Sequence, residues 1–336
     1  MRVFDAHCHL QDPRIWSKAP QLIAKAHEVG VVNFVVNGVS ENDWHLVKQL
    51  GQSYPTSVIP CFGLHPWFIQ ERTPSWFDML KQFFDSTPSA AVGEIGLDKS
   101  SRGKKIDFTD QVQVFQQQLQ LAKDLKRPVS IHCIRAFGDL LPIMQRIGPF
   151  PAGVILHSYL GSAEMVPEFA KLGAYFSFSG FLMSMEPRKA KKMLKMVPSE
   201  RILLETDAPD ALPKFVSDTL YPVEGDSSNS KELHAQEGIS GLDSASDGST
   251  MPKETLNHPA NIVNVLSYVA SLLELTKEEV AEVMPHEYSC QMGRAVLNAQ
   301  GLQILCDVQS TTDRLLCGVM LRGCCFVLCS RASGPV

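Results

Sequence analysis

The sequence lacks any long uninterrupted apolar stretch. Of its 336 residues, 44% are hydrophobic, but polar residues break every apolar run well short of the ~20 residues that a membrane helix needs. The first fifteen residues contain Asp5, His7, His9 and Asp12, where the apolar part of a secretory signal would have to lie. We therefore expect no membrane span and no signal peptide, and a location in the cytoplasm or also the nucleus.

An excess of positive charge is also absent. Acidic residues outnumber basic ones by 36 to 31, which gives a formal net charge of −5. A protein that coats nucleic acid through many phosphate contacts is normally basic. Any nucleic-acid substrate must therefore be held by local cations and bound metal ions, and no stable protein partner is implied.

The nine cysteines include no CxxC pair, and five of them lie between Cys306 and Cys329. Paired cysteines at that spacing are typical of small zinc sites, so their absence argues against a zinc knuckle in this tail. Without a secretory signal, we expect reduced thiols rather than disulfides.

Short apolar runs alternate with longer amphipathic stretches over the first 215 residues. Eight runs rich in Val, Ile and Phe are typical of strands buried on both faces, and they are 3–6, 32–39, 58–63, 90–95, 128–133, 153–157, 174–179 and 202–205. The segments 20–29, 42–52, 107–125, 163–172 and 186–196 carry apolar residues at helical spacing. The clearest stripe comprises Val112, Phe115, Leu119 and Ala122.

Eight such βαβ units predict an α/β fold closed into a (β/α)8 TIM-type barrel, which typically needs about 250 residues. An open doubly wound sheet is the alternative. The glycine-rich phosphate motif expected there does not follow the first strand, where Asp5-Ala6-His7-Cys8-His9 stands instead.

The composition changes after Asp207. Residues 217–254 are dense in Ser, Gly, Asp and Glu, which predicts a flexible insertion. Helical patterns return over 259–273 and 277–285, with Thr276 as a cap and Glu279 three residues later. We therefore expect a barrel domain over 1–297 and a cysteine-rich tail of no recognised fold over 298–336.

Polar residues stand where the predicted strands end, which is where barrel enzymes carry their chemistry. The ligand-type residues at the ends of five strands are His7, His9, Glu94, His132, His157 and Asp207. A single histidine at a strand end is more often a hydrogen-bonded core or loop residue than a ligand. So many imidazoles and carboxylates at one barrel mouth would be costly to bury without a cation, and the set therefore predicts a metal site.

Six ligands are too many for one tetrahedral ion with an open position. They suit two divalent ions about 3.5–4 Å apart, with Glu94 as the bridging carboxylate. Imidazole-rich ligation favours Zn or Mn, while carboxylates and a phosphate substrate also permit Mg, so the sequence does not choose the metal.

These stretches together resemble the TatD family of metal-dependent deoxyribonucleases, over about residues 1–297. The matching motifs are Asp5-Ala6-His7-Cys8-His9, Gly63-Leu64-His65-Pro66, Val92-Gly93-Glu94-Ile95-Gly96-Leu97-Asp98, Ile131-His132-Cys133, Leu156-His157, Leu204-Glu205-Thr206-Asp207-Ala208-Pro209 and a variant, Asn257-His258-Pro259-Ala260-Asn261. The resemblance implies a 3′–5′ exonuclease that hydrolyses DNA, as single strands or at 3′ ends, with the six residues as ligands of two ions. It also implies catalytic roles for Asp207, Glu94 and His65, with His65 near the substrate. We expect a further substrate contact from Arg135.

Three features depart from the family pattern. Arg135 stands where the segment after His132 usually has an aspartate, the 217–254 insertion separates Asp207 from Asn257, and the tail has no counterpart. None of these departures affects the six proposed ligands.

In the implied mechanism, water attacks the scissile phosphorus and Asp207 accepts its proton. Trp67 and Phe68 either stack on a base of a single strand or pack against a neighbouring loop. The basic segment 188–195 is either a DNA contact or a solvated face.

Two other functions stay open. The same architecture could hydrolyse a carboxylic ester or a cyclic amide, for example as an aminoacyl-tRNA deacylase. A non-catalytic barrel scaffold is disfavoured by the intact ligand set.

Overall fold

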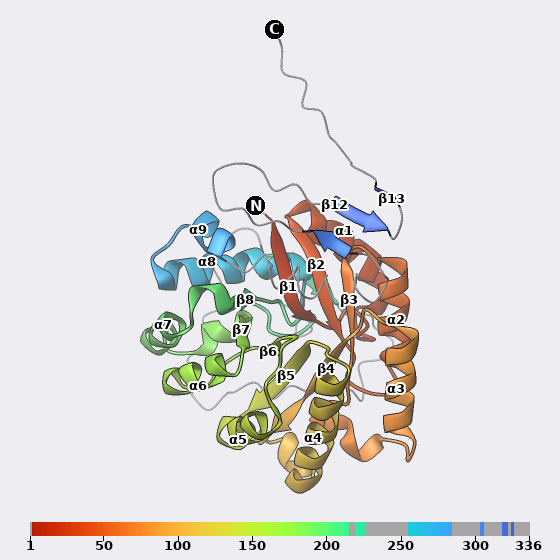
Figure 1. Ribbon diagram of the computed structural model, residues 1–336. Helices are drawn as coiled ribbons and strands as arrows, with labels where there is room; N and C mark the ends of the chain where they lie inside the picture. Colours follow the sequence, from red (N-terminus) through yellow and green to blue (C-terminus); the bar gives the residue numbers. More distant parts are fainter. Residues whose placement is uncertain are drawn as a thin grey trace.

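A computed structural model describes residues 2–214, 220–225 and 255–283, together with the backbone of 303–305, 318–321 and 324–325. Eight strands form one parallel sheet whose order follows the chain from β1 to β8 (Figure 1). The strands are β1 (Val3–Cys8), β2 (Val31–Asn37), β3 (Val58–Phe62), β4 (Ala91–Asp98), β5 (Val129–Ile134), β6 (Val154–Leu156), β7 (Ala174–Phe178) and β8 (Ile202–Leu204). All eight strand predictions are confirmed, with ends that differ by at most three residues.

The sheet closes where the first and last strands meet. Asp207 N–H donates to His7 O at 2.9 Å, and His9 N–H donates to Ala208 O at 2.7 Å. These two bonds join the carboxyl end of β1 to the segment that follows β8. The consecutive strand order and this contact confirm the barrel and exclude the open doubly wound sheet.

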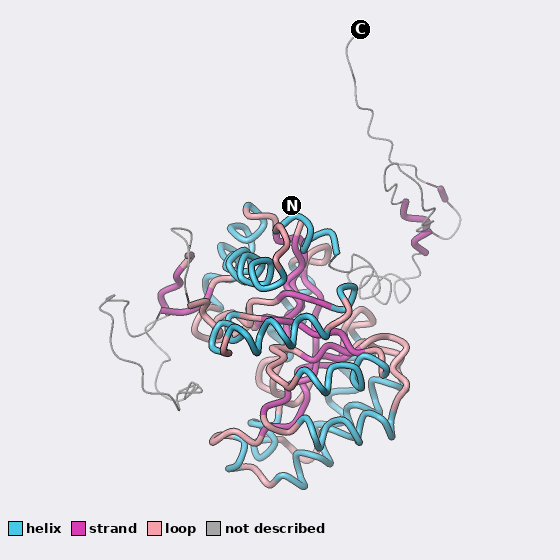
Figure 2. The backbone as a smooth tube through the Cα atoms, turned by 90° about the vertical axis from the view of Figure 1, so that its left-hand side faces the viewer, coloured by secondary structure: helices cyan, strands magenta, loops and turns pink. Residues whose placement is uncertain are grey.

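Helices lie outside the strands and cover the sheet (Figure 2). They are α1 (Ala19–Glu28), α2 (Trp44–Ser53), α3 (Trp76–Ser86), α4 (Phe108–Asp124), α5 (Phe137–Ile147), α6 (Val166–Lys171), α7 (Pro187–Met196), α8 (Ile262–Leu273) and α9 (Lys277–Val283). The capping box before α9 is confirmed, since Glu279 N–H donates to Thr276 Oγ1 at 3.1 Å and Thr276 N–H donates to Glu279 Oε2 at 2.7 Å. No helix within the described ranges is long and apolar enough to cross a bilayer.

Two helices, α3 and α5, were not among the predicted segments. Pro142 lies inside α5, where its missing donor ordinarily disfavours a helix. In α3 the buried side chains are Trp76, Leu80 and Phe84, a four-residue spacing that gives the helical signal.

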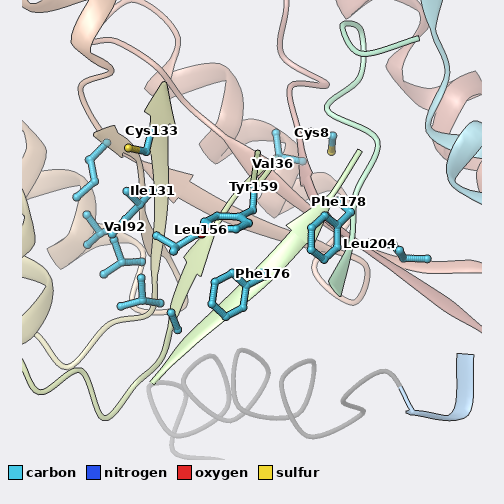
Figure 3. Packing of buried hydrophobic residues seen from close by; sticks show 14 of the residues in the cluster. Cys8, Val36, Val92, Ile131, Cys133, Leu156, Tyr159, Phe176, Phe178 and Leu204 are labelled. Carbon is cyan, nitrogen blue, oxygen red and sulfur yellow. The ribbon is translucent and has the colours of Figure 1, made fainter. Parts of the chain in front are cut away.

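Buried apolar side chains form two clusters, one on each face of the sheet. The larger cluster lies between the strands and the surrounding helices. Figure 3 shows part of it, with Phe176 and Phe178 of β7 beside their partners Leu156 and Leu204. The smaller cluster draws on seven of the eight strands, which places it inside the barrel, and comprises Phe4, Ala6, Val35, Ile59, Cys61, Ala91, Ile155 and Leu203, with Tyr175 packed against them. Because both faces are buried, the strands read as continuous apolar runs.

Most of the predicted 217–254 insertion and 298–336 tail lies outside the described residues. Within the first range, β9 (Pro222–Glu224) pairs antiparallel with β10 (Thr255–Asn257). Within the second, β11 (Gln303–Leu305), β12 (Gly318–Leu321) and β13 (Cys324–Cys325) form a separate antiparallel sheet.

Candidate metal centre

The six predicted ligands meet at the carboxyl end of the barrel strands. His7, Glu94 and His132 lie within β1, β4 and β5. His9 and His157 directly follow β1 and β6, and Asp207 stands three residues after the end of β8. Five of the six are buried, while His9 retains 13% of its side-chain exposure. Ligand atoms within 4.8 Å of one another form three overlapping groups, namely His7–His9–Glu94, His7–His157–Asp207 and His65–Glu94–His132.

Glu94 occupies the middle of this arrangement. Its Oε2 lies 3.4 Å from Nε2 of both His7 and His9. Its Oε1 lies 3.0 Å from His132 Nδ1 and 2.9 Å from His157 Nε2. The two carboxylate oxygens thus face two different sets of imidazoles, which is the arrangement that a bridging ligand requires.

In His7 and His9, a hydrogen bond at Nδ1 orients the ring so that Nε2 points towards Glu94. His7 Nδ1 lies 2.9 Å from Ser130 Oγ, and His9 Nδ1 lies 2.8 Å from the carbonyl oxygen of Asn37. A histidine that donates from one nitrogen presents a lone pair on the other, as metal ligation demands. These contacts orient both rings so that their Nε2 atoms face the centre.

Asp98 and Glu205 lie behind the other two imidazole rings, those of His132 and His157. The sequence did not predict a role for either carboxylate. Asp98 Oδ2 lies 3.0 Å from His132 Nε2, and Glu205 Oε1 lies 3.5 Å from His157 Nδ1. Both carboxylates stand within three residues of a strand end and belong to the recognised motifs, which was the available signal. Such carboxylate–histidine pairs orient a ligand and raise its basicity.

Glu205 is itself fixed by a cluster of hydroxyl groups. It accepts hydrogen bonds from Ser158 Oγ at 2.5 Å and Ser158 N–H at 2.7 Å, and also from Ser177 Oγ. Ser158 and Ser179 share a further hydrogen bond of 2.7 Å. The carboxylate is therefore buried but well supplied with donors.

Asp207 is placed by the seam between the first and last strands. Thr206 N–H and Oγ1 donate to the Asp5 carboxylate at 2.9 and 2.6 Å, and Asn257 Nδ2 donates to Thr206 O at 2.8 Å. Asp207 itself has a left-handed backbone with φ 52°, a conformation that Asp tolerates better than most residues. Its carboxylate Oδ1 lies 3.4 Å from His9 Nε2.

Arg14 ties the two turns of this seam together. Its guanidinium binds Asp12 at 2.8 and 2.9 Å and Asp210 at 3.0 Å through both oxygens of each carboxylate. The backbone N–H of Asp12 donates to His9 O at 2.9 Å, and that of Asp210 donates to Asp207 O at 2.8 Å. Arg14 thereby connects the turn after His9 to the turn after Asp207.

His65 lies beside the centre, with its Nε2 3.4 Å from Glu94 Oε1. The buried Gln118 of α4 holds the preceding residue, because its Oε1 accepts from Leu64 N–H at 2.7 Å and its Nε2 donates to Leu64 O at 3.1 Å. Gln111 of the same helix makes the corresponding pair with the backbone of Asp98, at 2.9 and 3.1 Å. Both glutamines lie on the buried face of α4, where a polar residue in the apolar stripe indicates a buried hydrogen-bond partner.

Arg135, the other predicted substrate contact, is exposed one residue after β5 ends. It forms no ion pair with any other residue that the structure describes, and its φ of 55° is left-handed. The structure does not bring Arg135 together with the ligand group.

Two lysines of the basic helix α7 form ion pairs with neighbouring glutamates. Lys191 lies 2.6 Å from Glu274, and Lys192 lies 2.6 Å from Glu164. Charge pairs of this kind are typical of a solvated surface.

The charges at the centre are strongly coupled. Burial alone would raise the pKa of Glu94, but the charges of the surrounding imidazoles hold it well below its usual range. Burial alone would lower the pKa of His9, but its hydrogen bond to Asp207 and the nearby carboxylates raise it to about 10. For His65, burial dominates and lowers the pKa to about 4. The carboxylate charges that raise the pKa of His9 also favour a bound cation at the centre, where a metal ion would take the place of imidazole protons.

The donor set fits divalent ions. Nitrogen and carboxylate oxygen are the ligands of Zn and Mn, and carboxylates also suit Mg. His7 Nε2 and His9 Nε2 lie 3.2 Å apart, so both can face one ion. His132 and His157, which face the other oxygen of Glu94, offer a second position that shares this carboxylate.

Comparison with known proteins agrees with this geometry. The model of the family described as TatD related DNase matches residues 4–288. An uncharacterized metal-dependent hydrolase of Haemophilus influenzae is 30% identical over 64% of this chain and 84% of its own length. A Pantoea protein named 3′-5′ ssDNA/RNA exonuclease TatD is 28% identical over 63% of this chain and 81% of its own.

Among crystal structures, that of YjjV, a TatD homologue from Escherichia coli K12, has the same fold. It matches with a TM-score of 0.67 at 23% identity, over 88% of this chain and 98% of its own. These matches confirm the resemblance predicted from the motifs. The chain belongs to the TatD related DNase family of metal-dependent hydrolases.

Proposed function

We propose that this chain is a deoxyribonuclease that removes nucleotides from the 3′ end of single-stranded DNA with two divalent ions. The ions would be held by His7, His9, Glu94, His132, His157 and Asp207. The catalytic residues would be Asp207, Glu94 and His65.

The observation that carries this proposal is the position of Glu94. One of its oxygens lies 3.4 Å from His7 and His9, and the other lies 2.9–3.0 Å from His132 and His157. A carboxylate with separate imidazole groups at each oxygen suits a pair of ions rather than one. Two-ion sites are common among enzymes that cleave phosphodiesters.

When bound, the ions would lower the pKa of water and neutralise charge that develops on the phosphate oxygens. Asp207, with its oxygen 3.4 Å from His9 Nε2, would orient the attacking water and accept its proton. Asp98 and Glu205 would keep the lone pairs of His132 and His157 directed into the centre. His65 would donate to a substrate oxygen.

The choice of DNA rests on the family and on the names of relatives. The family is described as TatD related DNase, and the Pantoea relative is named as an exonuclease on ssDNA and RNA. The net charge of −5 fits a protein that holds one strand locally rather than one that coats a duplex.

The direct test is digestion of a single-stranded oligonucleotide labelled at its 5′ end, by protein reconstituted with Mg, Mn or Zn, with and without a chelator. We expect a ladder that shortens from the 3′ end and disappears with chelator. Metal analysis of the same preparation should give about two ions per chain, as a bridged site implies.

Asp110→Asn provides a matched control for substitutions of the ligand carboxylates. Asp110 pairs with Arg72 at 2.9 Å on the outside of the barrel, so the same chemical change there should leave digestion unchanged. Hydrolysis of carboxylic esters without any cleavage of DNA would contradict the proposal and indicate an esterase of the same family.

A further inference from the structure

A tight loop follows β4 and returns onto the end of that strand. Ser100 N–H donates to Asp98 Oδ1 at 2.5 Å, and Gly103 N–H donates to Ser100 Oγ at 3.2 Å. A Cβ at residue 103 would lie 2.3 Å from Asp98 O, so only glycine permits this approach. Gln111 Nε2 also donates to Gly103 O at 2.9 Å. Residue 102 is thereby fixed at the mouth of the barrel.

Residue 102 is an arginine that stacks on an aromatic ring. Its guanidinium carbon lies 4.1 Å from the centroid of the Trp67 ring and 5.6 Å from that of Phe68. A guanidinium over an indole face is favourably placed, and its N–H donors remain in its own plane. This is the group that binds phosphate oxygens in a bidentate manner.

Trp67 joins this arginine to the metal centre. The centroid of its ring lies 4.7 Å from that of His65 and 5.9 Å from that of His132. Its Nε1 donates to Asp98 Oδ2 at 2.7 Å, the same oxygen that lies 3.0 Å from His132 Nε2. The indole is therefore anchored in place, and the cation on its face lies close beside the reacting centre.

We infer that Arg102, held on the face of Trp67, binds the DNA phosphate next to the scissile one. This inference rests on the proposed nuclease function. It addresses a need set by the sequence, since an acidic chain must hold a polyanion through a small number of fixed cations. It also changes the role of Trp67, whose ring supports the arginine rather than a base.

The test compares two substrates on metal-loaded protein. A single-stranded oligonucleotide has a flanking phosphate, whereas bis(p-nitrophenyl) phosphate is a phosphodiester without one. Arg102→Ala should raise KM for the oligonucleotide about tenfold, since hydrogen bonds to charged groups contribute on the order of that factor. Turnover of bis(p-nitrophenyl) phosphate should not change. The slope of log(kcat/KM) against log[salt] should fall by about 0.7, the value for one contact to a single strand.

Arg201→Ala is the matched control. Arg201 also lies over an aromatic ring, with its guanidinium carbon 5.3 Å from the centroid of Tyr175. It directly precedes β8, at the opposite end of that strand from Asp207. Removing it deletes the same charge and the same type of contact, and should affect neither substrate. Arg102→Lys keeps the charge without the planar fork and should give an intermediate KM.

Three results would overturn the inference in distinguishable ways. Equal kinetics for the Arg102→Ala and Arg201→Ala proteins on DNA would remove the phosphate contact but leave the nuclease function intact. Equal losses on both substrates would show that Arg102 acts on the centre through Trp67. Wild-type protein that cleaves only the small phosphodiester would contradict the nuclease proposal itself, and the inference with it.

Discussion

The metal centre has two halves that are built in different ways. His65, Glu94 and His132 come from the neighbouring strands β3, β4 and β5, which pair directly with one another, with a register shift in the β4–β5 pair between Val92 and Ile95. His7, His9 and Asp207 come from the first and last strands, which are joined by a few backbone bonds and by the side chains of Thr206 and Arg14. One half thus rests on a strand ladder, and the other rests on contacts between residues about 200 positions apart.

The two halves are also stabilised by different residues. The ladder half is reinforced from α4, where Gln118 and Gln111 bind the backbones of Leu64 and Asp98. The seam half is reinforced by Arg14 between Asp12 and Asp210. Substitution of Gln118 or Arg14 should weaken mainly one half, because the hydrogen bonds of each of these side chains reach residues of one half only.

The largest effect is expected at Asp207. Asp207→Asn keeps the shape of the side chain but removes the charge and the proton acceptor. Removing such a group commonly lowers turnover by ~10²–10⁴, and bound metal should fall from about two ions to about one because only the seam half is changed. Turnover and metal content should be measured on one preparation, with circular dichroism as the folding control. Wild-type turnover in the folded variant would contradict the catalytic role of Asp207. That result is expected if Asp207 only caps the following segment, because Asn would then be nearly neutral.

Loss of Arg14 should have the next largest effect. Arg14→Ala leaves the two carboxylates it joins close together without a counter-charge, and its side chain is only 20% exposed. We expect the free energy of unfolding to fall by about 2–3 kcal/mol, less than for a fully buried pair because of solvent screening. Turnover should fall about tenfold, since a misplaced Asp207 loses catalytic geometry.

Arg72→Ala is the control for Arg14→Ala, because Arg72 binds Asp110 through two nitrogens on the outside of the barrel. Urea unfolding and nuclease assays should show a small change in stability and none in turnover for the control. Equal behaviour of the two variants would mean that Arg14 is a surface ion pair without a positioning role.

On the ladder side, Gln118→Ala should have a smaller effect on catalysis. It leaves the N–H and C=O of Leu64 buried without these hydrogen bonds, which costs about 2 kcal/mol. The pairing of β3 with its neighbours β2 and β4 should limit displacement of His65, so we expect a fall in kcat/KM of about threefold and no loss of metal. Gln117→Ala, at the adjacent exposed position of α4, is the control, and metal loss in Gln118→Ala protein would contradict the proposed division.

In both halves of the centre, the sequence predicted the ligands but not the residues that support them. Alternating apolar runs predicted all eight strands, and strand ends predicted which polar residues meet, because parallel strands place their carboxyl ends at one edge. The partners behind the ligands were missed. Arg14 and Asp210 are 196 positions apart, and nothing in local periodicity pairs them. Gln111 and Gln118 look like ordinary polar helix residues until the loops they bind are placed.

Arg135 and Arg102 differ in how the sequence presents them. Arg135 stands next to a conspicuous ligand motif and is exposed after β5, and its contact with substrate stays a prediction. Arg102, which the motifs did not single out, lies over Trp67 beside the centre. The position of Arg102 depends on the path of the loop after β4, which the close contact at Gly103 sets. Loop paths are poorly encoded in local sequence patterns.

The smallest effect is expected from shortening the predicted 217–254 insertion without disturbing its described strand β9 (Pro222–Glu224). Removing the whole range would delete β9, whose register pairs Glu224 with Thr255 and Pro222 with Asn257. Asn257 in turn supports the turn that carries Asp207.

A sharper design replaces residues 225–254 with Asn-Gly, because two residues in a type I′ turn connect directly paired antiparallel strands. We expect wild-type turnover and a melting temperature within about 2 °C, since polar, low-complexity segments contribute few buried contacts. Deletion of 217–254, which also removes β9, is the comparison and should lower turnover by displacing Asn257. Loss of the cooperative thermal transition in the Asn-Gly protein would show that the segment is part of the barrel domain.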